Sequence, residues 1–268
     1  RIDKSILTQH AESYRKIRNT FRFILGNIKD NFEKQKIESL NIKNFNELEQ
    51  YILHKLFILN NSVKESLKNY NFHKLYKELL NFCALDLSSF YFDIRKDVLY
   101  CDNLNSKKRK DCIVVLNIIL DCLLKWFAPI LVFTTDEIYS LVSKDSNSIH
   151  EHKFPTIPKE FNNAILNEKW KQLFKIKQEA NIAIEEKRAS KEIGSSLEAE
   201  LKITTDSKNF KLLEGLDLAE YFITSKAEKF KSENKEELKI KVSKTNGTKC
   251  PRCWKILDSK CARCEKAT

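Results

Sequence analysis

The 268-residue chain contains only four Gly and four Pro, too few turn-forming residues for an all-β fold, so long helices are expected. With 42% hydrophobic and 32% charged residues, the composition is typical of a globular protein and excludes an intrinsically disordered chain. The net charge of +11 indicates an anionic partner such as nucleic acid or an acidic membrane surface, although a lysine-rich surface serving only solubility would carry the same charge. Residues 226–268 hold 13 Lys or Arg and 6 Asp or Glu, so the basic excess is concentrated there.

Apolar residues at helical spacing predict five helices in the first 150 residues. The predicted helices extend from Ser5 to about Phe32, from near Asn44, from about Phe72 to Ile94, from near Ser106 to about Pro129, and from Thr135 to Val142. Asn44 and Glu47 resemble a capping box at the start of the second helix. The fold class expected is mainly α, beginning with an antiparallel helical bundle.

The most apolar segment, residues 113–133, is long enough to span a membrane, but it carries Asn117, Asp121, Lys125 and Pro129 at four-residue spacing. Asp or Lys at the centre of a membrane span is costly. Asp121 and Lys125 are instead spaced as an i,i+4 ion pair on one helical face. We therefore predict a buried core helix at the centre of the bundle, and no membrane partner.

A Pro-containing linker from His150 to Pro158 precedes a segment of different composition, which predicts three domains: residues 1–150, 151–245 and 246–268. The middle one should hold a long charged helix from Asn167 to about Lys191, with Gly194 as its C-cap, and then a small α/β element. That element is expected to comprise strands at Leu197–Thr204, Glu220–Thr224 and Glu237–Val242, and a helix near Lys208–Leu213.

Two C-x-x-C units, Cys250–Cys253 and Cys261–Cys264, stand seven residues apart near the end of the chain. Two such turns can direct four thiolates at one point, which is the tetrahedral sulfur set of a zinc site. A disulfide pair or a redox dithiol is the alternative, but a redox motif usually occurs as a single unit beside a βαβ pattern. We predict one structural zinc per chain in a C-terminal zinc ribbon with four cysteine ligands, because residues 246–268 are too few to bury a core without it.

The other four cysteines are Cys83, Cys101, Cys112 and Cys122. They are scattered over apolar helical stretches, where free Cys behaves as a small hydrophobic residue. The lack of a disulfide framework indicates a reducing compartment, and the sequence shows no signal peptide, so a cytoplasmic protein is expected. The five histidines show no ligand spacing, and no catalytic residue is predicted.

Basic residues form three candidate contacts for nucleic acid. They are Arg15, Arg18 and Arg22 on one face of the first helix; Lys107, Lys108, Arg109 and Lys110 at the start of the fourth; and Arg252 and Lys255 beside Trp254 in the cysteine-rich tail. The first two groups could follow phosphates or form an ordinary solvated face. In the tail, Trp254 could stack on a base, or the cations could only neutralise a zinc–thiolate centre.

Several segments resemble the C-terminal region of bacterial isoleucyl-tRNA synthetases, in the order of that family. They are Ser13–Asn27, Tyr70–His73, Phe82-Cys83, Ser89–Asp97, Trp126–Glu137, Gly194–Ala199 and Lys249–Trp254 followed by Cys261–Cys264. The bundle segments are shared with the valyl, leucyl and methionyl relatives, whereas the Cys-Pro-Arg-Cys-Trp tail is similar to the isoleucyl enzyme. The connection between the two C-x-x-C units is shorter than that family leads one to expect.

The resemblance implies a class Ia anticodon-binding bundle whose partner is the isoleucine-specific tRNA. It also implies a parent enzyme, an isoleucine–tRNA ligase, that attaches isoleucine to its tRNA using ATP. The His-Ile-Gly-His and Lys-Met-Ser-Lys-Ser signatures of the ATP site do not occur in these 268 residues, so the chain is expected to lack the catalytic domain and to be inactive alone. We expect a monomer. The alternatives are a non-enzymatic zinc-ribbon adaptor and another nucleic-acid-binding protein.

Overall fold

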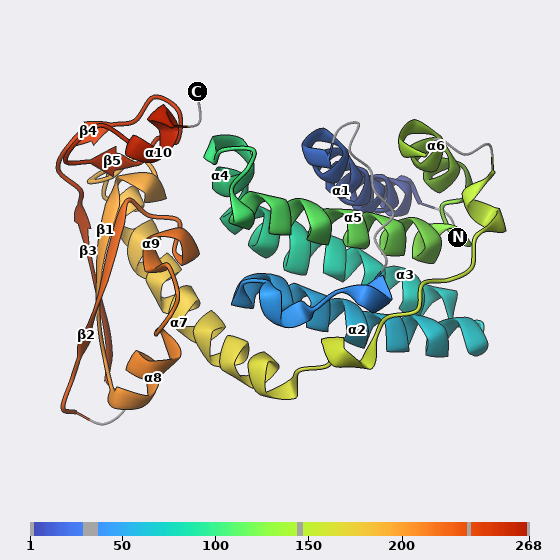
Figure 1. Cartoon of the computed structure of the whole chain (residues 1–268), viewed down its shortest axis with the longest axis horizontal. Coiled ribbons are helices and arrows are strands. Elements are labelled where there is room, and N and C mark those ends of the chain that lie inside the picture. The colour runs from blue at the N-terminus through green and yellow to red at the C-terminus, as the bar shows by residue number, and fades with distance from the viewer. Residues whose placement is uncertain (1–2, 29–36, 144–146, 235–236, 267–268) are drawn as a thin grey trace. The chain divides into compact units, whose positions relative to one another are not determined.

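The computed structural model of the chain describes residues 3–28, 37–143, 147–234 and 237–266 (Figure 1). These residues divide into two compact units. The first takes its residues from Arg1–Arg95 and Asn105–Asn163, and the second from Lys96–Leu104 and Ala164–Thr268. The boundaries at residues 150 and 245 stay a prediction.

The first unit is a bundle of helices connected by short segments. Its main helices are α1 (Lys4–Ile28), α2 (Glu47–Lys68), α3 (Phe72–Asn81), a π-helical segment (Phe82–Phe92), the first residues of α4 (Asp93–Cys101), α5 (Lys107–Phe127) and α6 (Val132–Val142). Helix α5 contacts α1, α2, α3 and α6, and its residues from Val115 to Phe127 are buried, so it is the central helix that the sequence predicted. The mainly α fold class is thereby confirmed.

The ion pair predicted on α5 is confirmed. Lys125 Nζ lies 2.6 Å from Asp121 Oδ2, and both side chains are largely buried. None of the described helices is both long enough and apolar enough to cross a membrane.

Some predicted helix boundaries were wrong. Asn44 ends a short 3₁₀ helix (Ile42–Asn44), and the residue before α2 is Asn46, whose side chain forms no capping hydrogen bond. The third helix does not end at Ile94: α3 passes through the π-helical segment into α4, which continues to Cys101, because no breaker interrupts the sequence. The predicted end of the first helix at Phe32 lies outside the described residues.

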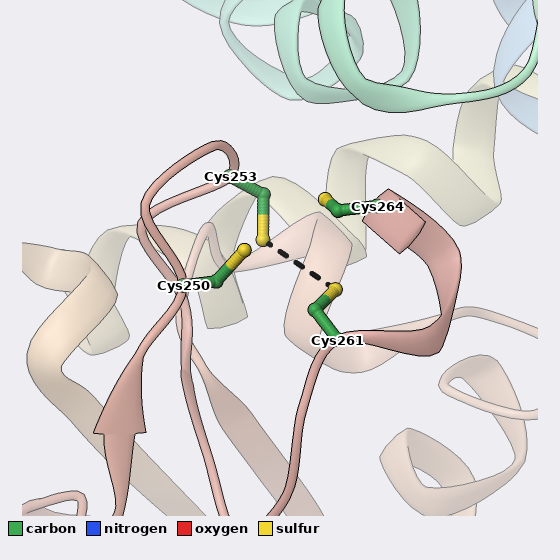
Figure 2. Close-up of side chains that lie close together, drawn as sticks. All are labelled: Cys250, Cys253, Cys261 and Cys264. Atoms are coloured by element: carbon green, nitrogen blue, oxygen red, sulfur yellow. Dashed lines mark hydrogen bonds between the residues drawn. The ribbon is translucent and has the colours of Figure 1, made fainter. Parts of the chain in front are cut away.

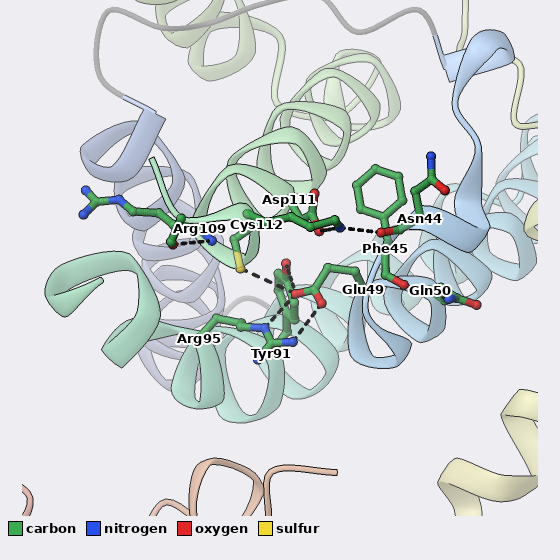
Figure 3. A network of polar contacts seen from close by, with 11 residues as sticks. Asn44, Phe45, Glu49, Gln50, Tyr91, Arg95, Arg109, Asp111 and Cys112 are labelled. Carbon is green, nitrogen blue, oxygen red and sulfur yellow. Dashed lines mark hydrogen bonds and ion pairs between the residues drawn. The ribbon is translucent and has the colours of Figure 1, made fainter. Parts of the chain in front are cut away.

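A buried polar network inside the bundle had no signal in the sequence (Figure 3). The guanidinium of Arg95 donates two hydrogen bonds to the carboxylate of Glu49, at 2.6 and 2.7 Å. The hydroxyl of Tyr91 donates to the same carboxylate at 3.2 Å, and the thiol of Cys112 lies 3.5 Å from it. These contacts join α2, the π-helical segment, α4 and α5 at one buried point.

The second unit is built on a three-stranded sheet in the order β2-β1-β3. Strand β1 (Ala199–Thr205) pairs in parallel with β2 (Lys226–Lys231) and antiparallel with β3 (Leu238–Lys244). Helix α7 (Ala164–Ala189) contacts β3, and the short helices α8 (Ser207–Leu212) and α9 (Leu218–Tyr221) contact β2. The inward side chains of β1 are buried, which places the core of this unit between sheet and helices.

Two predictions for this unit were wrong. Residues Glu220–Thr224 form the end of α9 and a turn, because the Asp217 side chain accepts a hydrogen bond from the Glu220 N–H and caps a helix there. The second strand of the sheet is β2 instead. It was missed in the sequence because its residues are mostly charged. Helix α7 is not capped by Gly194: Lys191 takes the left-handed conformation (φ 60°), and the Gly194 N–H donates to the Glu198 carboxylate.

Candidate functional site

The cysteine-rich tail begins with a minimal hairpin. Strand β4 (Thr248–Lys249) pairs antiparallel with β5 (Ile256–Leu257), and the first C-x-x-C unit forms the turn between them. Gly247 has φ 133°, and a Cβ atom there would lie 2.4 Å from the Leu257 carbonyl oxygen, so the tight pairing requires glycine. The turn is closed by the Trp254 N–H, which donates to the Cys250 carbonyl, and by the Cys250 N–H, which donates to that of Lys255.

The four tail cysteines lie close together, although the two units come from different turns. Cys261 immediately precedes the short helix α10 (Ala262–Glu265), which contains Cys264. The sulfur atoms all lie within 4.8 Å of one another, and those of Cys253 and Cys261 are 3.9 Å apart (Figure 2). Four sulfurs at about 2.3 Å from a zinc ion would be separated by about 3.8 Å along each tetrahedral edge. The spacing therefore suits a tetrahedral metal ion and is too long for a disulfide.

The surroundings of the sulfurs also suit a metal ion. Burial opposes ionisation of Cys250, but hydrogen bonds from the backbone N–H groups of Cys253 and Arg252, together with those from the thiols of Cys253 and Cys264, outweigh it and lower the pKa of this thiol to about 7. Burial raises the pKa of Cys253 and of Cys264. A bound cation would supply the positive charge that favours the thiolate form of all four groups.

The second C-x-x-C unit is attached to the C-terminal part of α4 by an ion pair. The two terminal nitrogens of Arg263 donate to the two carboxylate oxygens of Asp97, at 2.7 and 2.9 Å. The same guanidinium lies 3.4 Å from Asp102 Oδ1. Because the pairing uses both nitrogens, it fixes the orientation of the guanidinium as well as its distance.

The first C-x-x-C unit reaches the same part of the chain. The Arg252 guanidinium donates to the carbonyl of Tyr100 at 3.2 Å and to that of Cys264 at 3.5 Å. Two further contacts run from residues near the end of α4 to the tail. The Cys101 thiol lies 3.8 Å from the Arg252 carbonyl, and the Asn103 side-chain amide donates to the carbonyl of Lys266. Cys101 is therefore packed with the tail cysteines, a placement that its position in the sequence did not suggest.

The arginines of α1 are placed as the sequence predicted. Arg15, Arg18 and Arg22 are all exposed, while Ile17 and Phe21 on the other side of the helix are buried. Their side chains are therefore accessible to an anionic partner. Contact with RNA stays a prediction for all three.

The basic residues at the start of α5 differ from one another. Ser106 caps the helix, since its hydroxyl accepts a hydrogen bond from the Arg109 N–H. The Lys107 ammonium is bound to the Asp111 carboxylate at 2.5 Å and also donates to the Asn44 carbonyl, which offsets its unfavourable position at a helix N-terminus. Lys108 and Arg109 are half-buried, whereas Lys110 is exposed.

The three candidate RNA-binding residues in the tail differ in how far they are exposed. Trp254 is 60% exposed and has φ 64°, so its indole is presented to solvent by an uncommon backbone conformation. Arg252 and Lys255 are half-buried, and Arg252 already holds two carbonyl groups. A depression of about 620 Å³ opens beside the cysteines. Its lining includes Lys249, Arg252, Lys260 and Glu265.

Comparison with known proteins adds independent information. Residues 49–205 match the family model described as the anticodon-binding domain of tRNA ligase. The chain is 57% identical to an isoleucine–tRNA ligase of Pelagibacter ubique over 98% of its own length and 29% of that protein. It is 37% identical to those of Agrobacterium fabrum and Caldanaerobacter subterraneus, over 96% and 98% of its length and 27% and 31% of theirs.

The chain thus spans about three tenths of the length of these curated relatives. The family match covers more than half of the chain, from α2 through the central helix α5 to strand β1. This protein therefore belongs to the family of anticodon-binding domains of tRNA ligases.

Proposed function

We propose that the chain is the tRNA-recognition part of an isoleucine–tRNA ligase and that it binds the anticodon stem and loop of the isoleucine tRNA. The observation that carries this proposal is the 57% identity to a relative of that name along almost the whole chain, together with the family match. The exposed arginines of α1 and the net charge of +11 support a polyanionic partner.

In this proposal the RNA is held mainly through its phosphates. Arg15, Arg18, Arg22 and Lys110 offer exposed cations to the backbone, and the exposed indole of Trp254 offers a surface on which an unpaired base can stack. Phosphate contacts supply affinity and position, whereas stacking and base-edge hydrogen bonds supply sequence preference. Lys107, Lys108, Arg109, Arg252 and Lys255 are proposed to add to the positive potential.

Zinc is the metal proposed for Cys250, Cys253, Cys261 and Cys264, because four thiolates at this spacing match its preferred set. When bound, the ion cross-links the two turns. All four positions would be filled by protein sulfur, so the role is structural and no site remains for water or substrate.

The parent ligase is proposed to activate isoleucine with ATP and to esterify it to tRNA through residues outside these 268. We further propose a cytoplasmic monomer, and the free thiols of Cys83, Cys101, Cys112 and Cys122 support a reducing compartment.

The test is a titration of the 268-residue chain against isoleucine tRNA and two non-cognate tRNAs, by fluorescence anisotropy at several salt concentrations. We expect binding that weakens steeply with salt and that favours the isoleucine tRNA. Equal affinity for all three tRNAs at every salt concentration would contradict the isoleucine specificity. The absence of binding even at low salt would contradict RNA recognition altogether and favour the zinc-ribbon adaptor.

A further inference from the structure

The end of helix α4 is held by both C-x-x-C units at once. The last four carbonyl groups of a helix lack partners within the helix, and that end carries a partial negative charge. The Tyr100 carbonyl is one of these groups, and Arg252 of the first unit donates to it. Arg263 of the second unit binds Asp97 one turn earlier and also approaches Asp102. Two arginines thus cap a helix end that also bears two carboxylates.

The contacts of Arg263 indicate that this residue does more than balance the charge of a metal–thiolate centre. Arg263 faces two carboxylates, Asp97 and Asp102, so its positive charge is already offset within its own contacts. Burial of Asp97 opposes ionisation, yet the pair with Arg263 holds the pKa of this carboxyl below its ordinary value. Because the charge of Arg263 is paired with these carboxylates, it contributes little to neutralising four thiolates. The pairing instead attaches the second C-x-x-C unit to the end of α4.

We propose that Arg252 and Arg263 are positioning residues of the metal centre, which lock the two C-x-x-C units onto residues 97–103 so that metal binding and ordering of this helix end are one linked equilibrium. The inference rests on the proposed binding of zinc by the four cysteines. Each unit is a short turn with little core of its own. Arg252 also joins the two turns through the Cys264 carbonyl, and a metal ion bound by the four sulfurs would fix both turns, and with them both arginines, beside their partners in residues 97–103.

Linkage makes the effect reciprocal. If the metal favours the attached state of residues 97–103, the attachment must raise the affinity for metal by the same factor. Two consequences can be measured separately: removal of metal should loosen the helix end, and removal of the attachment should weaken metal binding. Neither readout requires aminoacylation.

The first measurement is zinc affinity, by competition with a chromogenic chelator. We expect Arg263→Ala and Asp97→Asn each to lower the affinity about tenfold, as removal of groups that support metal ligands commonly does. The double variant should be no weaker than the worse single one, because the two residues act as a pair. Arg263→Lys keeps the positive charge but loses the bidentate pairing with Asp97. This variant should therefore also bind zinc more weakly than the unmodified protein.

Lys260→Ala is the matched control, since Lys260 lies between the same two cysteine units and is exposed. It removes one positive charge and should change the zinc affinity less than twofold. If Arg263→Lys binds zinc as tightly as the unmodified protein while Arg263→Ala and Lys260→Ala are equally impaired, the arginine acts only through its charge and the inference is wrong.

The second measurement is hydrogen exchange of the unmodified chain with and without zinc. The Asp102 N–H, bonded to the Val98 carbonyl, and its neighbours in residues 99–102 should exchange at least tenfold faster after zinc is removed. The amides of β1 serve as an internal control and should not change. Zinc binding without any change at residues 99–102 would overturn the inference and leave the metal site standing, whereas failure to bind zinc at all would overturn both.

Discussion

Arg95 and Glu49 form a bidentate ion pair in the interior of the helical bundle, where their side chains are 3% and 0% exposed (Figure 3). The pair joins α2 to α4. Tyr91 and Cys112 approach the same carboxylate, so its oxygens have partners from several helices. Such a cluster fixes the mutual position of these helices more specifically than apolar contacts alone could.

Removal of one partner of this ion pair should strongly reduce the stability of the fold, although the pair lies away from the candidate site. Arg95→Met leaves the Glu49 carboxylate buried without its counter-ion, and we expect a loss of about 3–5 kcal/mol in the free energy of unfolding. Glu168→Gln, which breaks the exposed pair with Lys171, is the control and should cost less than about 1 kcal/mol. Urea denaturation measures both, and similar losses in the two variants would contradict the structural role of the buried pair.

His54 should make the bundle sensitive to mild acid. Its Nδ1 accepts a hydrogen bond from the Asn163 N–H, which requires the unprotonated nitrogen, and burial lowers the pKa of the imidazole below its ordinary value. A lowered pKa in the folded state means that the unfolded state binds more protons near pH 6. The stabilising contribution of neutral His54 is therefore complete above its pKa in the unfolded state. It is lost as the pH falls towards its lower pKa in the folded state. The free energy of unfolding should drop between pH 7.5 and 5.5 more steeply in the unmodified chain than in His54→Gln, and equal slopes would exclude this group.

Metal analysis should give one zinc ion per chain in freshly purified protein. The four sulfurs already lie at distances close to a tetrahedral set, so X-ray absorption should show four sulfur neighbours at about 2.3 Å. Cys253→Ser should reduce the zinc content and Cys122→Ser should not, because Cys122 is buried in α5. Protein that contains no zinc, or a Cys253–Cys261 disulfide found by mass spectrometry, would contradict the site.

Affinity for tRNA should fall with salt concentration in proportion to the number of phosphate contacts. Each contact contributes a slope of about −0.7 to −0.9 in log affinity against log salt. Arg18→Ala should weaken cognate and non-cognate tRNA alike and reduce the slope by about one. Lys16→Ala removes the same charge from another face of α1 and should have a smaller effect. An affinity independent of salt would be incompatible with this mode of binding.

Trp254→Ala tests the contribution of stacking. It should leave the salt slope unchanged and lower the affinity by about 1–3 kcal/mol if a base stacks on the indole. The distinction is informative because loss of a cation and loss of a stacking surface affect different quantities in the same titration. Unchanged affinity would remove Trp254 from the interface.

The chain alone should catalyse no isoleucine-dependent exchange of pyrophosphate into ATP. Neither ATP-site signature of the family occurs in its sequence, and four glycines are too few for a phosphate-binding loop elsewhere in it. A radioactive exchange assay with added zinc measures this directly. Exchange above the background of a mock purification would mean that the residues assigned to recognition include an active site.

The sequence by itself determined the elements whose pattern is local. The apolar stripes of the long helices, the i,i+4 pair of Asp121 and Lys125 and the duplicated C-x-x-C units can all be read over a few turns or a few residues, and the structure confirms the central buried helix and brings the four cysteines together. The strand at Lys226–Lys231 was missed because its partner strand, not its own composition, holds it in the sheet.

Only the tertiary structure decided which charged residues have partners within the chain. Arg252 and Arg263 look like Arg18 in the sequence, yet the first two are bound to the end of α4, whereas Arg18 lies on the exposed face of α1 beside Tyr14. Glu49 and Arg95 stand 46 positions apart, and Asp97 and Arg263 stand 166 apart. No local pattern can encode such pairs, because the energy of an ion pair depends on distance and burial in the folded chain and not on separation along the sequence.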